Sequence, residues 1–401
     1  MARHVLLMTN DFPPGVGGIE RYCHQLSRNL KMHRVTVCAP GHPRAEAFDR
    51  NEPYEVIRDE ARGRRSRLRA ALPVERKAVY APQWWGSRSG RRAEAAARAI
   101  EVVKATRPDV VCFGSAFPLG LLAGPITEVT GVPCIAFTHG VEASVAGSFL
   151  EQRLFTRMAQ DVQAFTAASR WTADRIAGAL HGKRPVEVVY GGVDVNTFHP
   201  EVDGGRVRAR FGIGAAPVCV CVGRLVLRKG QDQLIRAWPE VTRRVPGARL
   251  LLVGDGPDAP SLRRMANGLP VDFAGAVSAA EVPAYFAAGD VFAMPCRTRL
   301  WGADLEGLGI AFLEASATGL PVVVGRAAGA PETVEHGVTG LLADGNDPSS
   351  VADTVATLLA DPDKARVMGR AGREHVVRRF TWTTAAARLE ELMTRVADNN
   401  A

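Results

Sequence analysis

The sequence predicts an α/β protein with two doubly wound parallel-sheet domains, and three observations carry this prediction. Short apolar runs of strand length alternate strictly with helix-length segments. Such alternation is typical of mainly parallel sheets covered by helices on both faces. The chain has 401 residues, enough for two separate hydrophobic cores. Glycines at 204, 205, 212 and 214 mark loops, after which the alternation restarts.

The first half predicts seven strands separated by helices, because apolar runs are bounded by turn residues. Strands are expected at residues 5–9, 35–38, 54–57, 109–113, 133–138, 162–168 and 186–190. Helices are expected at residues 19–30, 91–106, 118–130, 148–159 and 171–180. We place the domain boundary near Val195, so the first domain comprises residues 1–194.

The second half repeats the pattern over residues 195–381. Strands are expected at residues 218–222, 250–253, 271–274, 291–294 and 321–324. Helices are expected after Gly309 and at residues 348–359, 364–379 and 382–396. Ligands of such sheets bind beyond the carboxyl ends of the strands, which is where we look for a site.

The composition favours an ordinary soluble protein, with 46% hydrophobic and 23% charged residues. No apolar run approaches the roughly 20 residues that cross a bilayer, so we expect neither export nor a membrane span. Seven cysteines without a Cys-x-x-Cys pair indicate a reducing compartment and no structural zinc site. Cys219 and Cys221 alternate on a predicted strand and are expected in the core.

Positive charge is concentrated in the segment from Arg58 to Arg98. It holds twelve basic and four acidic residues, a net +8 that equals the excess of the whole chain. With Trp84 and Trp85, this segment suits an anionic membrane surface. Nucleic acid would need a recognition motif, and we find none. A solvated basic loop has the same composition.

The stretch 304–324 contains a glycine-rich turn, a predicted helix and two carboxylates. Glu306 precedes the helix and Glu314 follows eight residues later, so both could face one cleft. The backbone N–H groups of Gly307, Leu308 and Gly309 would attract phosphate. Carboxylates and phosphate-binding amides together indicate a sugar nucleotide, although a solvated helix of an α/β domain would show the same spacing.

Three other positions lie at predicted strand ends. Gly17 and Gly18 precede a helix and would let a diphosphate approach the backbone closely. His139 directly follows a strand. Arg224 and Lys229, five residues apart across a strand-to-helix turn, could converge on one anion.

The pattern Glu306-x7-Glu314, preceded by Met-Pro-Cys-Arg-Thr-Arg at 294–299 and followed by Gly-Ala-Pro-Glu at 329–332, resembles the signature of family 4 retaining glycosyltransferases of the GT-B type. The amino-acid sequence around this pattern is most similar to that of the phosphatidyl-myo-inositol mannoside mannosyltransferases. The resemblance implies two Rossmann-like domains facing a central cleft. Residues 1–194 would bind the acceptor, 195–381 the nucleotide sugar, and a last helix at about 382–401 would cross back to the first domain.

The resemblance also implies roles for single residues. Arg224 and Lys229 would clamp the donor diphosphate, and His139 would contact the transferred sugar. The backbone of Val277 would contact the nucleobase. Some relatives carry an acid where this chain has Ala279, so the identity of the donor's nucleobase stays open.

Further assignments follow from the same resemblance. Gly17 and Gly18 would contact the diphosphate, Glu306 would orient the hexose, and Glu314 would hold the ribose. Together with His139, Arg224 and Lys229, Glu306 completes the expected catalytic set.

The implied reaction is retaining transfer of mannose from GDP-mannose to a phosphatidylinositol mannoside. We expect no required cofactor, no protein-bound metal and at most nonspecific Mg²⁺. The implied location is cytoplasmic and peripheral, on the cytoplasmic membrane face. A family 4 enzyme acting on a soluble acceptor with a GDP- or UDP-sugar is the main alternative, and a non-catalytic sugar-nucleotide or lipid binder is the other. The oligomeric state stays open.

Overall fold

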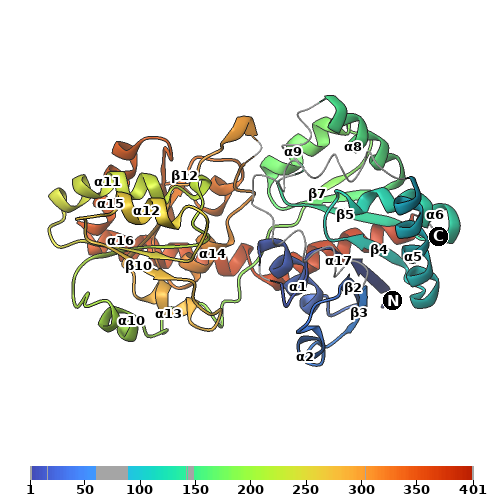
Figure 1. Cartoon of the computed structure of the whole chain (residues 1–401), viewed down its shortest axis with the longest axis horizontal. Coiled ribbons are helices and arrows are strands. Elements are labelled where there is room, and N and C mark those ends of the chain that lie inside the picture. The colour runs from blue at the N-terminus through green and yellow to red at the C-terminus, as the bar shows by residue number, and fades with distance from the viewer. Residues whose placement is uncertain are drawn as a thin grey trace. The chain divides into compact units, whose positions relative to one another are not determined.

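A computed structural model gives the structure of the protein and describes residues 2–15, 17–59, 89–140, 142, 149–302 and 304–399. The chain divides into two compact units (Figure 1). The first unit comprises Met1–Ala168, Thr172–Val189 and Ala385–Ala401, and the second comprises Ser169–Trp171 and Tyr190–Thr384. The division at Val189 falls a few residues before the expected boundary near Val195.

The first unit is built on a seven-stranded sheet in the order β3-β2-β1-β4-β5-β6-β7, whose neighbours all pair in parallel. The strands are β1 (His4–Met8), β2 (Arg34–Pro40), β3 (Glu55–Asp59), β4 (Val110–Phe113), β5 (Cys134–Thr138), β6 (Ala164–Ala167) and β7 (Val186–Val188). β4, β5 and β6 are buried along their whole length, as parallel strands covered on both faces require. The strand order reverses between β1 and β4, a topological switch point where ligands of such sheets bind.

Helices connect these strands. They are α1 (Gly18–Asn29), α2 (Ala45–Asp49), α5 (Ser89–Thr106), η1 (Leu119–Leu122), α6 (Ala123–Thr130), α8 (Phe149–Asp161) and α9 (Arg170–Ala179). The last helix, α17 (Trp382–Asp398), contributes its residues from Ala385 onward to this unit. The sulfur of Met393 lies 3.7 Å from Cys112 Sγ, so α17 packs against β4.

The second unit contains a six-stranded parallel sheet in the order β10-β9-β8-β11-β12-β13. The strands are β8 (Val218–Val222), β9 (Arg249–Val253), β10 (Val271–Gly275), β11 (Val291–Met294), β12 (Val322–Gly325) and β13 (Gly340–Ala343). Its switch point lies between β8 and β11. All residues of β8 are buried, including Cys219 and Cys221, which confirms their expected place in the core.

The helices of the second unit enclose this sheet (Figure 1). They are α10 (Gly205–Arg210), η2 (Leu227–Lys229), α11 (Gln231–Arg244), α12 (Ala259–Met265), α13 (Val282–Ala287), η3 (Leu300–Gly302), α14 (Ile310–Ala317), η4 (Ala330–Thr333), α15 (Pro348–Leu359) and α16 (Pro362–Arg379). The largest core side chains include Trp238 of α11, Phe292 of β11 and Phe312 of α14, all fully buried.

The expected elements outside residues 60–88 are present to within a few residues, with one split. The predicted helix at 118–130 is divided into η1 and α6. Pro125 has no N–H group, so a single α-helix across this stretch would lack a backbone hydrogen bond. The short elements α2, α10, α12, α13 and β13 were not predicted, because four to seven residues carry too little periodicity.

Candidate active site

The turn between β8 and α11 carries both predicted clamp cations. Arg224 follows β8 after one residue, Gly223, and Lys229 ends the short helix η2. Gly230 then starts α11 with a φ of 79°, and a Cβ there would lie 2.1 Å from the carbonyl oxygen of Pro295. Only glycine fits this position, so the strand-to-helix turn brings the cations beside the loop that follows β11.

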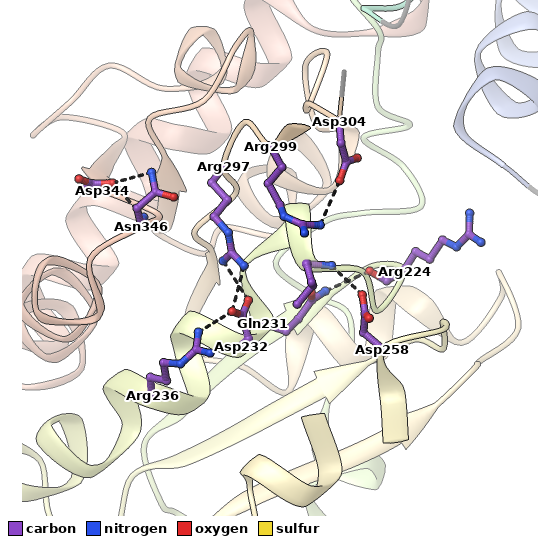
Figure 2. A network of polar contacts seen from close by, with 11 residues as sticks. Arg224, Gln231, Asp232, Arg236, Asp258, Arg297, Arg299, Asp304, Asp344 and Asn346 are labelled. Carbon is purple, nitrogen blue, oxygen red and sulfur yellow. Dashed lines mark hydrogen bonds and ion pairs between the residues drawn. The ribbon is translucent and has the colours of Figure 1, made fainter. Parts of the chain in front are cut away.

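Two polar side chains hold this turn in shape (Figure 2). Gln231 donates from its side-chain amide to the Arg224 carbonyl oxygen at 3.1 Å. Asp258 accepts a hydrogen bond from the Leu227 N–H at 2.9 Å. Asp258 precedes α12 and belongs to the stretch that starts with Gly-Asp-Gly-Pro at 254–257. Sequence reasoning missed both supports, although an Asp before a helix signals a cap.

The two clamp cations differ in their surroundings. The Arg224 side chain is exposed and points away from the other labelled side chains in Figure 2. Within the described ranges it has no ion-pair or hydrogen-bond partner. Lys229 instead lies in an ion pair, with its Nζ 2.7 Å from Glu306 Oε2. The structure therefore brings Lys229 and Glu306 together and leaves Arg224 available to a ligand.

Glu306 is a buried carboxylate with two cationic neighbours. Its side chain is 10% exposed, and Arg228 Nε lies 3.7 Å from the oxygen that also contacts Lys229. Burial by itself would raise the pKa of Glu306, but the charges of Lys229 and Arg228 lower it below the ordinary value. The group is therefore an anion at neutral pH, and both of its oxygens can accept hydrogen bonds from sugar hydroxyls.

The helix α14 begins at the predicted glycine-rich turn. Gly309 has a φ of 90°, and a Cβ there would lie 2.6 Å from the Phe312 ring. The amides of Gly307, Leu308 and Gly309 donate no hydrogen bond to any residue that the structure describes. Three such amides at a helix N-terminus can bind an anion. Glu314 lies buried within α14, on the element that these amides start.

In the first unit, His139 stands at the carboxyl end of β5, as predicted. Its Nε2 lies 2.7 Å from the Gly114 carbonyl oxygen, its backbone N–H donates to Glu142 at 2.9 Å, and its ring meets Tyr22 edge-on. Because a carbonyl oxygen only accepts, Nε2 is the donor in this hydrogen bond. The contacts with Gly114 and Tyr22 thus hold the ring in place.

Gly17 precedes α1 and Gly18 begins it, and Tyr22 of the same helix reaches His139. A Cβ at Gly17 would lie 2.1 Å from a carboxyl oxygen of Glu20, whereas Gly18 is open. Burial raises the pKa of Glu20, because desolvation disfavours the charged form of its carboxyl. Sequence reasoning missed Glu20, which lies in the first turn of α1, next to the predicted phosphate-approach loop.

Val277 lies in the loop after β10, and its partly buried side chain packs against the core of the second unit. The next residue, Ser278, donates its hydroxyl and its amide to Glu281. The Ser278 hydrogen bonds lower the pKa of Glu281. An acid therefore lies close to the predicted base-contacting residue, although Ala279 itself has no polar side chain.

The described residues contain no cluster of three metal-ligand side chains. The arrangement instead offers anion-binding groups at the switch point of the second unit. Lys229 follows β8 and Glu306 follows β11, the two strands between which the order reverses. This geometry suits a ligand with both phosphate and hydroxyl groups.

Comparison with known proteins gives family matches in both halves of the chain. The family model for Glycosyltransferase Family 4 matches residues 16–197, and the model for Glycosyl transferases group 1 matches residues 216–361. The chain is 41% identical to the GDP-mannose-dependent alpha-(1-6)-phosphatidylinositol monomannoside mannosyltransferase of Mycolicibacterium smegmatis, over 97% of this chain and 98% of the relative. It is 34% identical to the corresponding monoacylated monomannoside mannosyltransferase of Corynebacterium glutamicum, over 98% of both chains.

Among solved structures, Anabaena HepE in complex with UDP aligns with a TM-score of 0.77 at 21% identity, over 98% of this chain and 100% of that chain. This likeness shows the fold, which is GT-B with a parallel sheet in each unit. The sequence relatives cover nearly the whole chain at well above the level of chance similarity. The chain is a member of glycosyltransferase family 4.

Proposed function

We propose that this protein transfers mannose from GDP-mannose to a phosphatidylinositol mannoside with retention of configuration. The printed activity of the Mycolicibacterium and Corynebacterium relatives supports this donor and this class of acceptor. The observation that carries it is the Lys229–Glu306 pair between β8 and β11, beside the exposed Arg224 and the three amides before α14 that donate to no described residue. Cations and amides suit the diphosphate, and the carboxylate suits sugar hydroxyls.

In this proposal the main catalytic contribution is electrostatic. As the bond between mannose and the diphosphate breaks, negative charge develops on the leaving phosphate. Arg224, Lys229 and the amides of Gly307 to Gly309 stabilise that charge. Glu306 and His139 orient the hexose, and Glu314 holds the ribose. The leaving phosphate takes the acceptor's proton, and no side chain is assigned as a nucleophile.

The test is an assay of radiolabelled mannose transfer from GDP-mannose to phosphatidylinositol monomannoside in vesicles. Arg224→Ala and Lys229→Ala should each lower turnover by about a hundredfold, since one lost contact to developing charge costs about 3 kcal/mol. Arg244→Ala, which removes an ion pair with Asp353, is the matched control and should keep full turnover. Transfer by the folded double variant at the wild-type rate would refute the clamp, and transfer only to soluble acceptors would refute the lipid assignment.

We further propose that no resident cofactor or metal is required. Arg224, Lys229 and the amides before α14 supply countercharge for the diphosphate from the protein itself. Transfer should therefore persist after treatment with EDTA. A loss of activity that Mg²⁺ restores would show that a metal ion is needed.

The proposed location is the cytoplasmic membrane face, with peripheral attachment. Within the described ranges, no helix combines the length and apolar character that crossing a bilayer requires. Of the twelve bases in the Arg58 to Arg98 segment, only the two end residues have described side chains. Arg58 pairs with Asp49, and Arg98 pairs with Glu94. Docking would therefore depend on the ten bases in between. Those up to Arg88, with Trp84 and Trp85, lie outside the described residues, and Arg91 and Arg92 lie in α5.

Vesicle co-sedimentation tests this docking. Each engaged Arg contributes roughly 1 kcal/mol near an anionic surface, and salt weakens the attraction. The test variant changes five arginines of the segment to Ser: Arg62, Arg64, Arg65, Arg67 and Arg69. The control changes five exposed arginines of the second unit to Ser: Arg243, Arg244, Arg263, Arg366 and Arg378. We expect only the test variant to lose binding to anionic vesicles, and equal losses would contradict docking through this segment.

A further inference from the structure

Arg228 has no assigned role, yet its guanidinium lies between the two acids of the loop after β11. Its Nη1 is 3.5 Å from Asp304 Oδ1, and its Nε is 3.7 Å from Glu306 Oε2. Lys229 approaches the same Glu306 oxygen at 2.7 Å. A nearly buried carboxylate thus has two cations from adjacent residues of one turn.

The two cations cannot remain equivalent once a donor binds. If Lys229 contacts the diphosphate, its ammonium must divide its hydrogen bonds between phosphate oxygens and Glu306. A buried carboxylate that loses its nearest cation is strongly destabilised. Arg228 is the second cation on that oxygen, and its planar fork can contact two acids at once, which an ammonium does less well.

The backbone of Arg228 is held in a fixed frame. Its carbonyl oxygen accepts a hydrogen bond from the Arg297 N–H at 2.9 Å. The Arg297 guanidinium in turn binds both carboxyl oxygens of Asp232, each at 2.9 Å (Figure 2). Asp232 lies in the first turn of α11, directly after the clamp turn. Arg228 therefore projects from a rigid support, as a positioning group requires.

We propose that Arg228 is a positioning residue that keeps Glu306 ionised and in place when Lys229 turns to the donor diphosphate. This inference rests on the proposed function, because it assumes a diphosphate ligand at Lys229. The charged and titratable groups that face Glu306 are Lys229, Arg228 and the thiol of Cys296, whose pKa burial and Glu306 raise to about 12. Asp304 shares Arg228 with it. Cys296 stays neutral, so Arg228 alone remains to balance Glu306.

The test compares Arg228→Met with Arg299→Met. Arg299 also lies 3.5 Å from Asp304, but the ion pairs of Glu306 among the described residues are with Arg228 and Lys229, so Arg299 is a matched control. In Arg228→Met, kcat/KM for the donor should fall about tenfold, the scale of one hydrogen bond to a charged group. The acidic limb of its pH profile should move to higher pH by at least about half a unit. Arg228→Lys should reduce the size of both effects. Arg299→Met should leave the acidic limb of the pH profile where it is in the wild type.

A second measurement decides the matter even if the donor assignment fails. The pH dependence of the thermal unfolding midpoint should shift upward in Arg228→Met, because Glu306 then gains a proton at higher pH. In a Glu306→Gln background, Arg228→Met should no longer move that dependence. A shift equal to that of Arg299→Met, or no shift, would overturn the role of Arg228. Absence of GDP binding and of transfer in the wild type would instead refute the proposed function.

Discussion

Replacing Arg297 with Met should destabilise the second unit more than any change to a surface ion pair. Arg297 binds Asp232 through two hydrogen bonds of 2.9 Å, and the side chains are 10% and 3% exposed. Removing one partner of a buried pair costs about 3–5 kcal/mol. Arg236 also contacts Asp232, so some compensation remains and the lower end, about 3 kcal/mol, is expected.

The matched control is Arg236→Met. Arg236 pairs with the same carboxylate at 2.6 Å, but its side chain is 49% exposed and lies four residues along α11. Such helix pairs contribute about 0.3–0.5 kcal/mol. The comparison removes one guanidinium from the same acid in both variants, so it separates burial from charge.

Differential scanning calorimetry of the full chain is the assay. For a unit of this size, 1 kcal/mol corresponds to about 2–4 °C, so Arg297→Met should lower the melting midpoint by about 6–12 °C. Arg236→Met should lower it by about 1–2 °C on the same scale. Equal shifts in the two variants would refute the argument that burial makes this pair important.

Three further outcomes are expected. Gly309→Ala should lower stability more than Gly268→Ala, because both have positive φ but only Gly309 would place its Cβ against the Phe312 ring, and calorimetry compares them. Glu314→Gln should weaken GDP binding in calorimetry, whereas Glu306→Gln should mainly lower kcat. The depressed pKa of Glu306 stabilises the fold fully above its ordinary pKa of 4.5, and this contribution is lost as pH falls through the folded value. Glu306→Gln should therefore flatten acid destabilisation, and an unchanged acid slope would contradict it.

The fold was predictable because it depends on local patterns. An apolar run such as Val218–Val222 can be recognised as a strand from a short stretch of sequence. Parallel pairing then follows from the alternation of such strands with helices. The placement of Arg224 and Lys229 on one turn was also predictable, since they lie five residues apart, and their role as a clamp stays a prediction. His139 was placed by its position after a strand, and the structure supports a fixed ring there.

The supports of the site could not be predicted in this way. Asp232 and Arg297 are 65 residues apart in the chain, and Leu227 and Asp258 are 31 apart. Nothing in either local pattern says that these groups meet, because their contact depends on which strands become neighbours. The adjacency of β8 and β11 is such a tertiary fact, and it brings Arg228 beside Asp304.

The balance of charges around the switch point of the second unit explains how the site can bind a diphosphate and still keep both of its acids paired. Three cations there, Arg228, Lys229 and Arg299, are paired with two acids, Asp304 and Glu306, which leaves one positive charge in excess. The exposed Arg224 adds a second. A sugar-nucleotide diphosphate carries one negative charge on each phosphate, so the two excess charges match it without displacing either acid. Glu306 can then stay an anion beside the bound hexose, because the cation that balances its charge is not one of those that bind the diphosphate.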